Sequence, residues 1–234
     1  MNSDPKYYFG TSFAIFFHVS SGDVFQQHVA SQIILGLDHD IHVLDEDNQE
    51  YSGRIVLIKP LVKSNIQCEG HYTHLFLSPT LGLTSDIIAL AGEADIHILA
   101  DATQLPFNIR APRAELITAL NRLDATSIER LDPRLLAVLD DLDQNLENPS
   151  ILEAAKRSGL SRSRVRTLAR EQMGIPLSNW VTWRKLVKSN RALSDGANLS
   201  EAALAGHFSD QAHFSRTMKK MFGVTPTQAS RVYS

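Results

Sequence analysis

Two basic segments near the end of the chain, each preceded by an Ala-rich segment and a turn, constrain the fold most strongly. The first reads SRSRVRTLAREQMG from Ser161 to Gly174, and the second reads SDQAHFSRTMKKMFG from Ser209 to Gly223. The segment ILEAAKRSGL precedes the first, and EAALAGHF precedes the second. A short helix, a tight turn and a second helix, repeated in this way, predict two helix-turn-helix units over residues 150–174 and 199–223.

The first unit has turn and capping residues where such a unit needs them. Gly159 is expected to end the short helix, because glycine adopts a positive φ without steric cost. Ser161 is expected to cap the longer helix, whose buried face would hold Val165, Leu168 and Ala169. The opposite face can present guanidinium groups to phosphates and guanine edges, although for any single arginine a solvated surface charge is the favoured interpretation. The candidate DNA-binding residues of this helix are Arg162, Ser163, Arg166, Thr167 and Arg170.

The second unit repeats this pattern, with Ser209 as the expected helix cap. Its predicted apolar face consists of Phe214, Met218, Met221 and Phe222. Glutamine can form two hydrogen bonds with adenine and arginine two with guanine, whereas the lysines here are expected to contact phosphates. His213 could contact a base or be a surface residue without a partner. The candidate DNA-binding residues of this helix are Gln211, Ala212, His213, Arg216, Lys219 and Lys220.

The segment between the two units, PLSNWVTWRKLVKSNRAL over residues 176–193, has apolar residues at helical spacing. It predicts a helix of about 27 Å, at 1.5 Å per residue, with Trp180 and Trp183 in the core. Two reading helices that enter successive major-groove segments must lie about 34 Å apart. A stiff connector would define that spacing, whereas a flexible one would not.

The first hundred residues contain short apolar or β-branched runs separated by polar, Gly, Pro or Asn breaks. The runs are FAIFFHV, SQIILGL, IHVLD, RIVLIKP, THLFLSP and IHILAD. Many short strands at close spacing predict a sandwich or barrel. Residues 83–92 fit either a short helix or a further strand. The predicted fold class is therefore α+β, with an N-terminal β-barrel or sandwich followed by an all-α domain.

Helical spacing takes over after residue 112. Three leucines form an apolar seam that could pack on the strand domain or on a second copy of the chain. They are Leu116, Leu120 and Leu123. A further helix is expected over about 132–146, with an apolar face that the basic module would cover. The predicted organisation is a β domain for sensing or dimerisation over residues 1–110, a linker helix over 111–128 and a DNA-binding domain over 129–234.

Charge is divided unevenly along the chain. Residues 150–234 hold 14 Lys and Arg against 5 Asp and Glu, a net charge of +9. Residues 1–149 hold 9 against 21, a net charge of −12, which gives −3 for the whole chain. A basic module joined to an acidic one is typical of a phosphate-binding domain linked to a domain that does not bind DNA. A basic tail that only aids solubility is the plainer alternative, but here the cations fall on two specific helices.

Hydrophobic runs and cysteine content indicate where in the cell the protein is expected. The apolar run from Phe13 to Val19 is too short to cross a bilayer and contains His18. No basic segment precedes this run, so no signal peptide is expected. The single cysteine, Cys68, excludes an internal disulfide and fits a reducing cytoplasm. We therefore expect a cytoplasmic protein without membrane contact.

The last hundred residues resemble the AraC/XylS family of transcriptional regulators. The resemblance begins near Asp132, runs through LSRSRVRTLARE and is most specific over FSDQAHFSR and the following KKMFGVTP. It implies a seven-helix domain with two helix-turn-helix units, joined by a long helix, that binds promoter DNA. By resemblance, the base-reading positions fall on Ser163, Arg166 and Thr167 in the first unit and on Gln211, Ala212, His213 and Arg216 in the second.

The sequence departs from the family pattern in three ways. His207 stands where the family usually has a turn glycine, with Gly206 one residue earlier, and this change could alter the helix angle. Ala169 and Arg170 replace a common Phe–Arg or Phe–Lys pair, and Thr167 replaces a frequent arginine. These departures bear on sequence preference more than on DNA binding.

The N-terminal half is similar, more faintly, to the cupin-type sensing domain that precedes this module in the family. A metal-binding cupin needs a closely spaced His-x-His followed by Glu and a later His. That arrangement is absent among His39, His42, Cys68, His71 and His74. On a strand, residues i and i+3 point to opposite faces, so His71 and His74 would not converge unless a turn intervenes. No metal, cofactor or catalytic residue is therefore expected.

These patterns predict a sequence-specific DNA-binding regulator of bacterial type rather than an enzyme. Its expected partner is double-stranded DNA. A small-molecule effector, RNA polymerase and a second copy of the chain are further candidates that the resemblance implies. One alternative is a cupin-like metalloenzyme whose helical tail is an accessory. Another is a ligand-binding or partner-binding protein that has lost DNA recognition.

Overall fold

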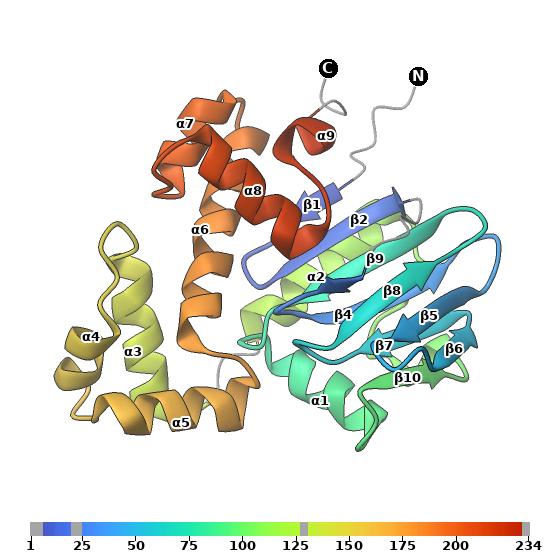
Figure 1. Ribbon diagram of the computed structural model, residues 1–234, viewed down its shortest axis with the longest axis horizontal. Helices are drawn as coiled ribbons and strands as arrows, with labels where there is room; N and C mark the ends of the chain where they lie inside the picture. Colours follow the sequence, from blue (N-terminus) through green and yellow to red (C-terminus); the bar gives the residue numbers. More distant parts are fainter. Residues whose placement is uncertain (1–6, 20–24, 127–130, 231–234) are drawn as a thin grey trace.

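The computed structural model describes residues 7–19, 25–126 and 131–230, in which a β domain is followed by a helical domain (Figure 1). The described strands form two antiparallel sheets, one ordered β1-β2-β9-β4-β7-β10 and the other β3-β8-β5-β6. The strands are β1 (Tyr7–Phe9), β2 (Phe13–Val19), β3 (Gln26–Gln27), β4 (Ser31–Gly36), β5 (Ile41–Asp45), β6 (Glu50–Gly53), β7 (Ile55–Ile58), β8 (Lys63–Gln67), β9 (Tyr72–Leu77) and β10 (Ile96–Leu99). The predicted α+β class, with strands first and helices after, is confirmed.

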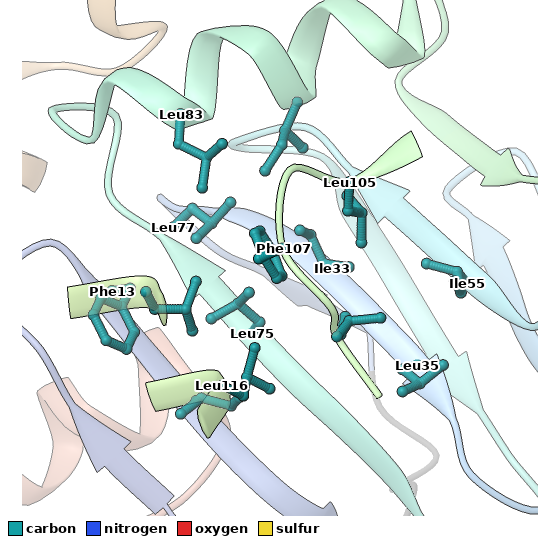
Figure 2. Close-up of a cluster of buried hydrophobic side chains, with 14 of the residues drawn as sticks. Phe13, Ile33, Leu35, Ile55, Leu75, Leu77, Leu83, Leu105, Phe107 and Leu116 are labelled. Atoms are coloured by element: carbon teal, nitrogen blue, oxygen red, sulfur yellow. The ribbon is translucent and has the colours of Figure 1, made fainter. Parts of the chain in front are cut away.

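Central strands of the larger sheet send alternate side chains into two different cores, as the period of two along a strand requires. In β9, Leu75 and Leu77 enter a cluster of buried aliphatic and aromatic side chains on one face of the sheet (Figure 2). His74 and Phe76 point to the other face, where their rings stack with centroids 4.0 Å apart. The near-continuous apolar runs of the sequence follow from this, because both faces of these strands are buried.

Two helices cover the first of these faces. One, α1 (Gly82–Ala91), places Leu83 and Ile87 in the cluster, so the segment 83–92 that fitted either a helix or a strand is a helix. The other, α2 (Arg113–Thr126), buries Leu116 and Leu120 in the same cluster. The leucine seam therefore packs within the chain. The predicted end of the linker helix at residue 128 lies outside the described residues.

The described helical domain contains seven α-helices, as the family resemblance implied. They are α3 (Pro133–Gln144), α4 (Ile151–Arg157), α5 (Arg162–Met173), α6 (Leu177–Ser194), α7 (Leu199–Ala205), α8 (Gln211–Phe222) and α9 (Pro226–Ser230). A short 3-10 helix, η1 (Ala102–Gln104), lies earlier, between β10 and α2. In Figure 1, α6 runs between α3–α5 and α7–α9 and thus connects the two units. Among the described helices, none is both long and apolar enough to span a membrane.

The long helix α6 joins two separate hydrophobic cores. Trp180 is buried in the core of the first unit, together with the apolar face of α3 and the buried side of α5. Trp183, one turn later, is buried in the core of the second unit. Both tryptophans are thus core residues, as their spacing predicted. Because each end of α6 is packed into one unit, α6 fixes how far the units lie from each other.

The core of the second unit continues into the β domain through a group of five rings, which we call the aromatic joint. It consists of Phe9, Phe16, Phe76, Trp183 and Phe222. The ring of Phe222, at the end of α8, has its centroid 5.2 Å from those of Phe9 and Phe76. It lies 5.7 Å from Phe16 and 5.5 Å from Trp183. Edge-to-face and tilted pairs at such distances are favourable beyond the area that they bury.

Charged side chains of α6 add polar contacts between the two domains. Arg184 donates to both carboxylate oxygens of Asp143 in α3, at 2.7 and 2.9 Å, and to the backbone oxygen of Thr11, at 3.1 Å. Arg191 donates to the hydroxyl of Thr11 at 2.6 Å. The turn between β1 and β2 is therefore held by two arginines of the helical domain.

We expect Phe222→Ala to lower the free energy of unfolding by about 3–5 kcal/mol, because it leaves a cavity where both domains meet. Phe25→Ala is the matched control, since the Phe25 side chain is 37% exposed and should cost about 1 kcal/mol or less. Urea unfolding of the full chain measures both values. Equal losses of unfolding free energy in the two variants would contradict the claim that the aromatic joint stabilises the chain.

Candidate nucleic-acid interface

The first candidate helix, α5, begins and ends as its sequence predicted. The hydroxyl of Ser161 accepts a hydrogen bond from the backbone N–H of Arg164 at 3.2 Å, so Ser161 is the helix cap. Gly159, in the preceding turn, has a φ of 67°. Val165, Leu168 and Ala169 are buried, as expected.

The other face of α5 is open. All five candidate residues there are exposed: Arg162, Ser163, Arg166, Thr167 and Arg170. A loose ion pair joins Arg164 to Glu171, at 3.8 Å between Nη1 and Oε2, on the same exposed surface. The exposed surface of α5 therefore carries four guanidinium groups, one of them loosely paired with a carboxylate.

The second candidate helix, α8, begins one residue later than predicted. Ser209 is not its cap; Asp210 is, because its carboxylate accepts the backbone N–H of His213 at 2.7 Å. A carboxylate suits this position, since the N-terminus of a helix carries partial positive charge. The hydroxyl of Ser209 instead donates to the other oxygen of Asp210, at 3.0 Å. These bonds, the one from His213 first, lower the pKa of Asp210 below its ordinary value.

The groove-facing candidates of α8 are also all exposed: Gln211, Ala212, His213, Arg216, Lys219 and Lys220. The predicted apolar face of Phe214, Met218, Met221 and Phe222 is buried. Around the helix, Arg216 lies opposite this buried face, as 100° per residue requires. Both candidate helices thus bury one side in a core and leave a basic side accessible.

The turns before α5 and α8 differ for a steric reason. In the second unit Gly206 lies directly on α6, where an added Cβ would be 2.0 Å from the hydroxyl of Ser189 and 2.5 Å from the backbone oxygen of Lys185. The glycine is therefore required for space. The next residue, His207, takes the left-handed conformation, with a φ of 55°. In the first unit Gly159 has the positive φ and its added Cβ would meet nothing within 4 Å.

The structure also contains a cleft that the sequence did not predict. Its volume is about 440 Å³, and it lies between α8, α6 and the β domain. Gln27 and Leu61 line it from the β domain, Lys185 from α6, and His213 and Lys220 from α8. Burial lowers the pKa of Lys185. No local pattern could have revealed this cleft, because contacts between distant parts of the chain form it.

The histidines and the cysteine of the β domain do not form a metal site in the described part of the chain. His42 pairs with Glu50 at 2.7 Å and His71 with Asp38 at 3.6 Å, and these pairs are exposed. Among the described residues, no three His, Cys, Asp or Glu side chains lie close enough to hold a metal ion. His74 instead bonds Gln32 at 3.0 Å.

A buried histidine adds a hydrogen bond between the β domain and α8. The Nδ1 of His28 lies 2.5 Å from the backbone oxygen of Met221, the residue before Phe222. Because a carbonyl oxygen only accepts, Nδ1 carries the hydrogen. Burial lowers the pKa of His28 to about 4, although the bond to Met221 acts in the opposite direction. Burial also lowers the pKa of His74, whose ring centroid is 6.0 Å from that of His28.

Both parts of the chain are similar to known proteins. Residues 154–231 match a family model described as a helix-turn-helix domain. The HTH-type regulator YkgA of Escherichia coli (strain K12) is 33% identical over 108 residues, which cover 45% of each chain. The match therefore spans less than half the length of this relative. The resemblance that the sequence predicted for the carboxyl-terminal part is confirmed.

Solved structures extend the likeness in fold to nearly the whole chain. An apo form of ToxT from Vibrio cholerae strain SCE256 has a TM-score of 0.60 and 12% identity, and the alignment covers 96% of this chain and 99% of ToxT. Unsaturated fatty acid bound wild-type ToxT from the same strain has a TM-score of 0.58 and 12% identity, with 96% and 97% covered. At this identity the likeness shows the fold: strands first, then a helical domain.

We expect acid to destabilise the folded chain through His28, because protonation would place a charge in a buried site. The pKa of His28 lies near 4 in the folded chain and near 6.5 in an unfolded one, so between these values the unfolded chain binds more protons. The free energy of unfolding keeps its full contribution from neutral His28 above pH 6.5. This free energy falls by about 3 kcal/mol as the pH drops to 4. His28→Asn keeps an N–H for Met221 but does not titrate. Urea unfolding at several pH values should give a shallower fall for this variant; identical slopes would contradict the assignment.

Proposed function

We propose that this chain, whose carboxyl-terminal part matches a helix-turn-helix domain, is a regulator of the AraC type that binds DNA with α5 and α8 in two successive major-groove segments. It acts by binding rather than by catalysis. Phosphate contacts supply affinity and base contacts supply sequence choice.

One observation carries this proposal: both reading helices leave a basic face exposed while α6, packed into both units, spaces them. The 18 residues of α6 correspond to about 27 Å at 1.5 Å per residue. Successive major-groove segments on one face of DNA lie about 34 Å apart, and this is the spacing that the proposal requires of α5 and α8.

Each candidate residue has a proposed role. Arg216 reads guanine and Gln211 reads adenine, because each side chain can form two hydrogen bonds with that base. Lys219 and Lys220 contact phosphates. Ala212 and His213 complete the base-reading surface of α8. In the first unit the base-reading residues are Ser163, Arg166 and Thr167, and Arg162 and Arg170 are further DNA-binding residues.

The β domain has a sensing role in this proposal. We assign residues 1–110 to that domain, 111–128 to a linker helix and 129–234 to DNA binding. The packing of α2 on the β core supports a linker that moves with the β domain. ToxT, which shares this fold, is described in one structure as bound to an unsaturated fatty acid. This supports a small-molecule effector for the present chain. A second copy of the chain and RNA polymerase are further proposed partners, in the cytoplasm.

Selection of genomic DNA fragments by the purified full chain tests the proposal. We expect the recovered fragments to share one sequence with two conserved blocks about 10 base pairs apart. Recovery of fragments without a shared sequence, at 0.15 M salt, would refute sequence-specific binding.

We expect Arg216→Ala to lower affinity for the selected site by about 1–3 kcal/mol and to relax the choice at one base pair. The reason is that one side chain contacts the edge of one base. Arg110→Ala is the matched control, because Arg110 is exposed and lies in the β domain. Titration of both variants against single-base changes of the site measures the effect. If the Arg216 variant discriminated among sites as well as the parent chain, the role of Arg216 would be wrong.

Lys219→Ala should weaken binding to specific and unrelated DNA nearly equally, because a phosphate contact does not depend on sequence. The slope of log affinity against log salt should become shallower by about 1. Affinities measured between 50 and 200 mM salt give this slope. A loss confined to the specific site would show that Lys219 contacts a base instead.

A further inference from the structure

Three hydrogen bonds at the start of α8 link Ser209, Asp210 and His213 to one another. Asp210 accepts the backbone N–H of His213 with Oδ1, at 2.7 Å, and the hydroxyl of Ser209 with Oδ2, at 3.0 Å. The hydroxyl oxygen of Ser209 also lies 3.1 Å from Nδ1 of His213. The side chains of residues 209 and 213 are therefore linked through an oxygen that is itself held by the helix cap.

The available hydrogens fix the direction of each bond. The lowered pKa of Asp210 keeps it a carboxylate at neutral pH, and a carboxylate only accepts. The single hydroxyl hydrogen of Ser209 is therefore used toward Asp210. Ser209 can only accept from His213, which requires the hydrogen of the imidazole to be on Nδ1. In the neutral ring, Nε2 is then left with a free lone pair.

The ring of His213 is also held in orientation and open to solvent. Phe208 packs against it edge to face, with centroids 5.2 Å apart and an interplanar angle of 89°. The His213 side chain is exposed and also lines the cleft between α8, α6 and the β domain. Within the described part of the chain, the hydrogen bond of its ring is made by Nδ1, and Nε2 has none. Arg216, the proposed guanine reader, lies three residues later on the same exposed side of the helix.

From this geometry we propose that His213 reads an exocyclic amino group in the major groove and that Ser209 is the positioning residue that sets its tautomer. The inference rests on the proposed function, since it specifies one base contact of α8. Nε2 accepts a hydrogen bond from N6 of adenine or N4 of cytosine, the bases that present an amino donor there. Guanine and thymine present acceptors O6 and O4 and are rejected, because two acceptors would face each other.

The tautomer can be measured without DNA. In two-dimensional ¹H–¹⁵N NMR spectra of the full chain at neutral pH, we expect His213 to show a protonated Nδ1 and an unprotonated Nε2. Ser209→Ala should move the hydrogen toward Nε2, whereas Ser209→Thr, which keeps the hydroxyl, should restore the parent pattern. Ser200→Ala, a change to another exposed serine, should leave the spectrum of His213 unchanged. A hydrogen on Nε2 in the parent chain would overturn the inference.

The base contact is tested on DNA from which single amino groups have been removed. Each adenine of the selected site is replaced in turn by purine, and each cytosine by 2-pyrimidinone. At one position the parent chain should lose affinity about fivefold, the effect of one neutral hydrogen bond. Whether that position holds adenine or cytosine identifies the base. His213→Ala should be insensitive at the same position, and Ser209→Ala should lose most of the discrimination, which Ser209→Thr retains.

These outcomes separate the inference from the proposed function. If the parent chain binds its site but no amino group matters more to it than to the His213→Ala variant, His213 does not read an amino donor. If the parent chain selects no site, the proposed function fails, and the NMR spectra still decide whether Ser209 sets the tautomer.

Discussion

The packing of Phe222 against the sheet is the interaction on which the arrangement of the two domains depends. This residue ends α8, and its ring lies among Phe9, Phe16 and Phe76 of the β domain and Trp183 of α6. The second unit and the sheet consequently share one core. The first unit has its own core, to which the described part of the β domain adds the partly buried Leu61. The position of α8 therefore depends on the β domain much more than that of α5 does.

This asymmetry explains the local details of the second unit. Gly206 lets α7 lie against α6, so the left-handed conformation moves to His207 and the turn has a different sequence from that of the first unit. Asp210 then caps α8 and positions the side chains around it. The backbone oxygen of Met221 accepts from His28, a residue of the β domain. The start of the reading helix is thus organised by its own turn, and its end by the β domain.

The sequence predicted what local periodicity and turn chemistry determine. Ser161, Gly159 and the two tryptophans of α6 behave as predicted, because capping, positive φ and helical spacing act over a few residues. The predicted cap of α8 was wrong by one residue, because Ser209 and Asp210 are adjacent and the side chain of either can cap a helix. The aromatic joint could not be predicted, because residues 9, 16 and 76 meet residue 222 only through tertiary folding. The exposure of every candidate binding residue agrees with the predicted pattern, and their contacts with DNA stay a prediction.

The central claim is that α5 and α8 read one face of the same duplex. Methylation interference at guanine N7, with the full chain on its selected site, tests this most directly because N7 lies in the major groove. The account predicts two groups of interfering guanines whose centres lie about 10 base pairs apart. A single group, or two groups about 5 or 15 base pairs apart and so on opposite faces, would contradict it.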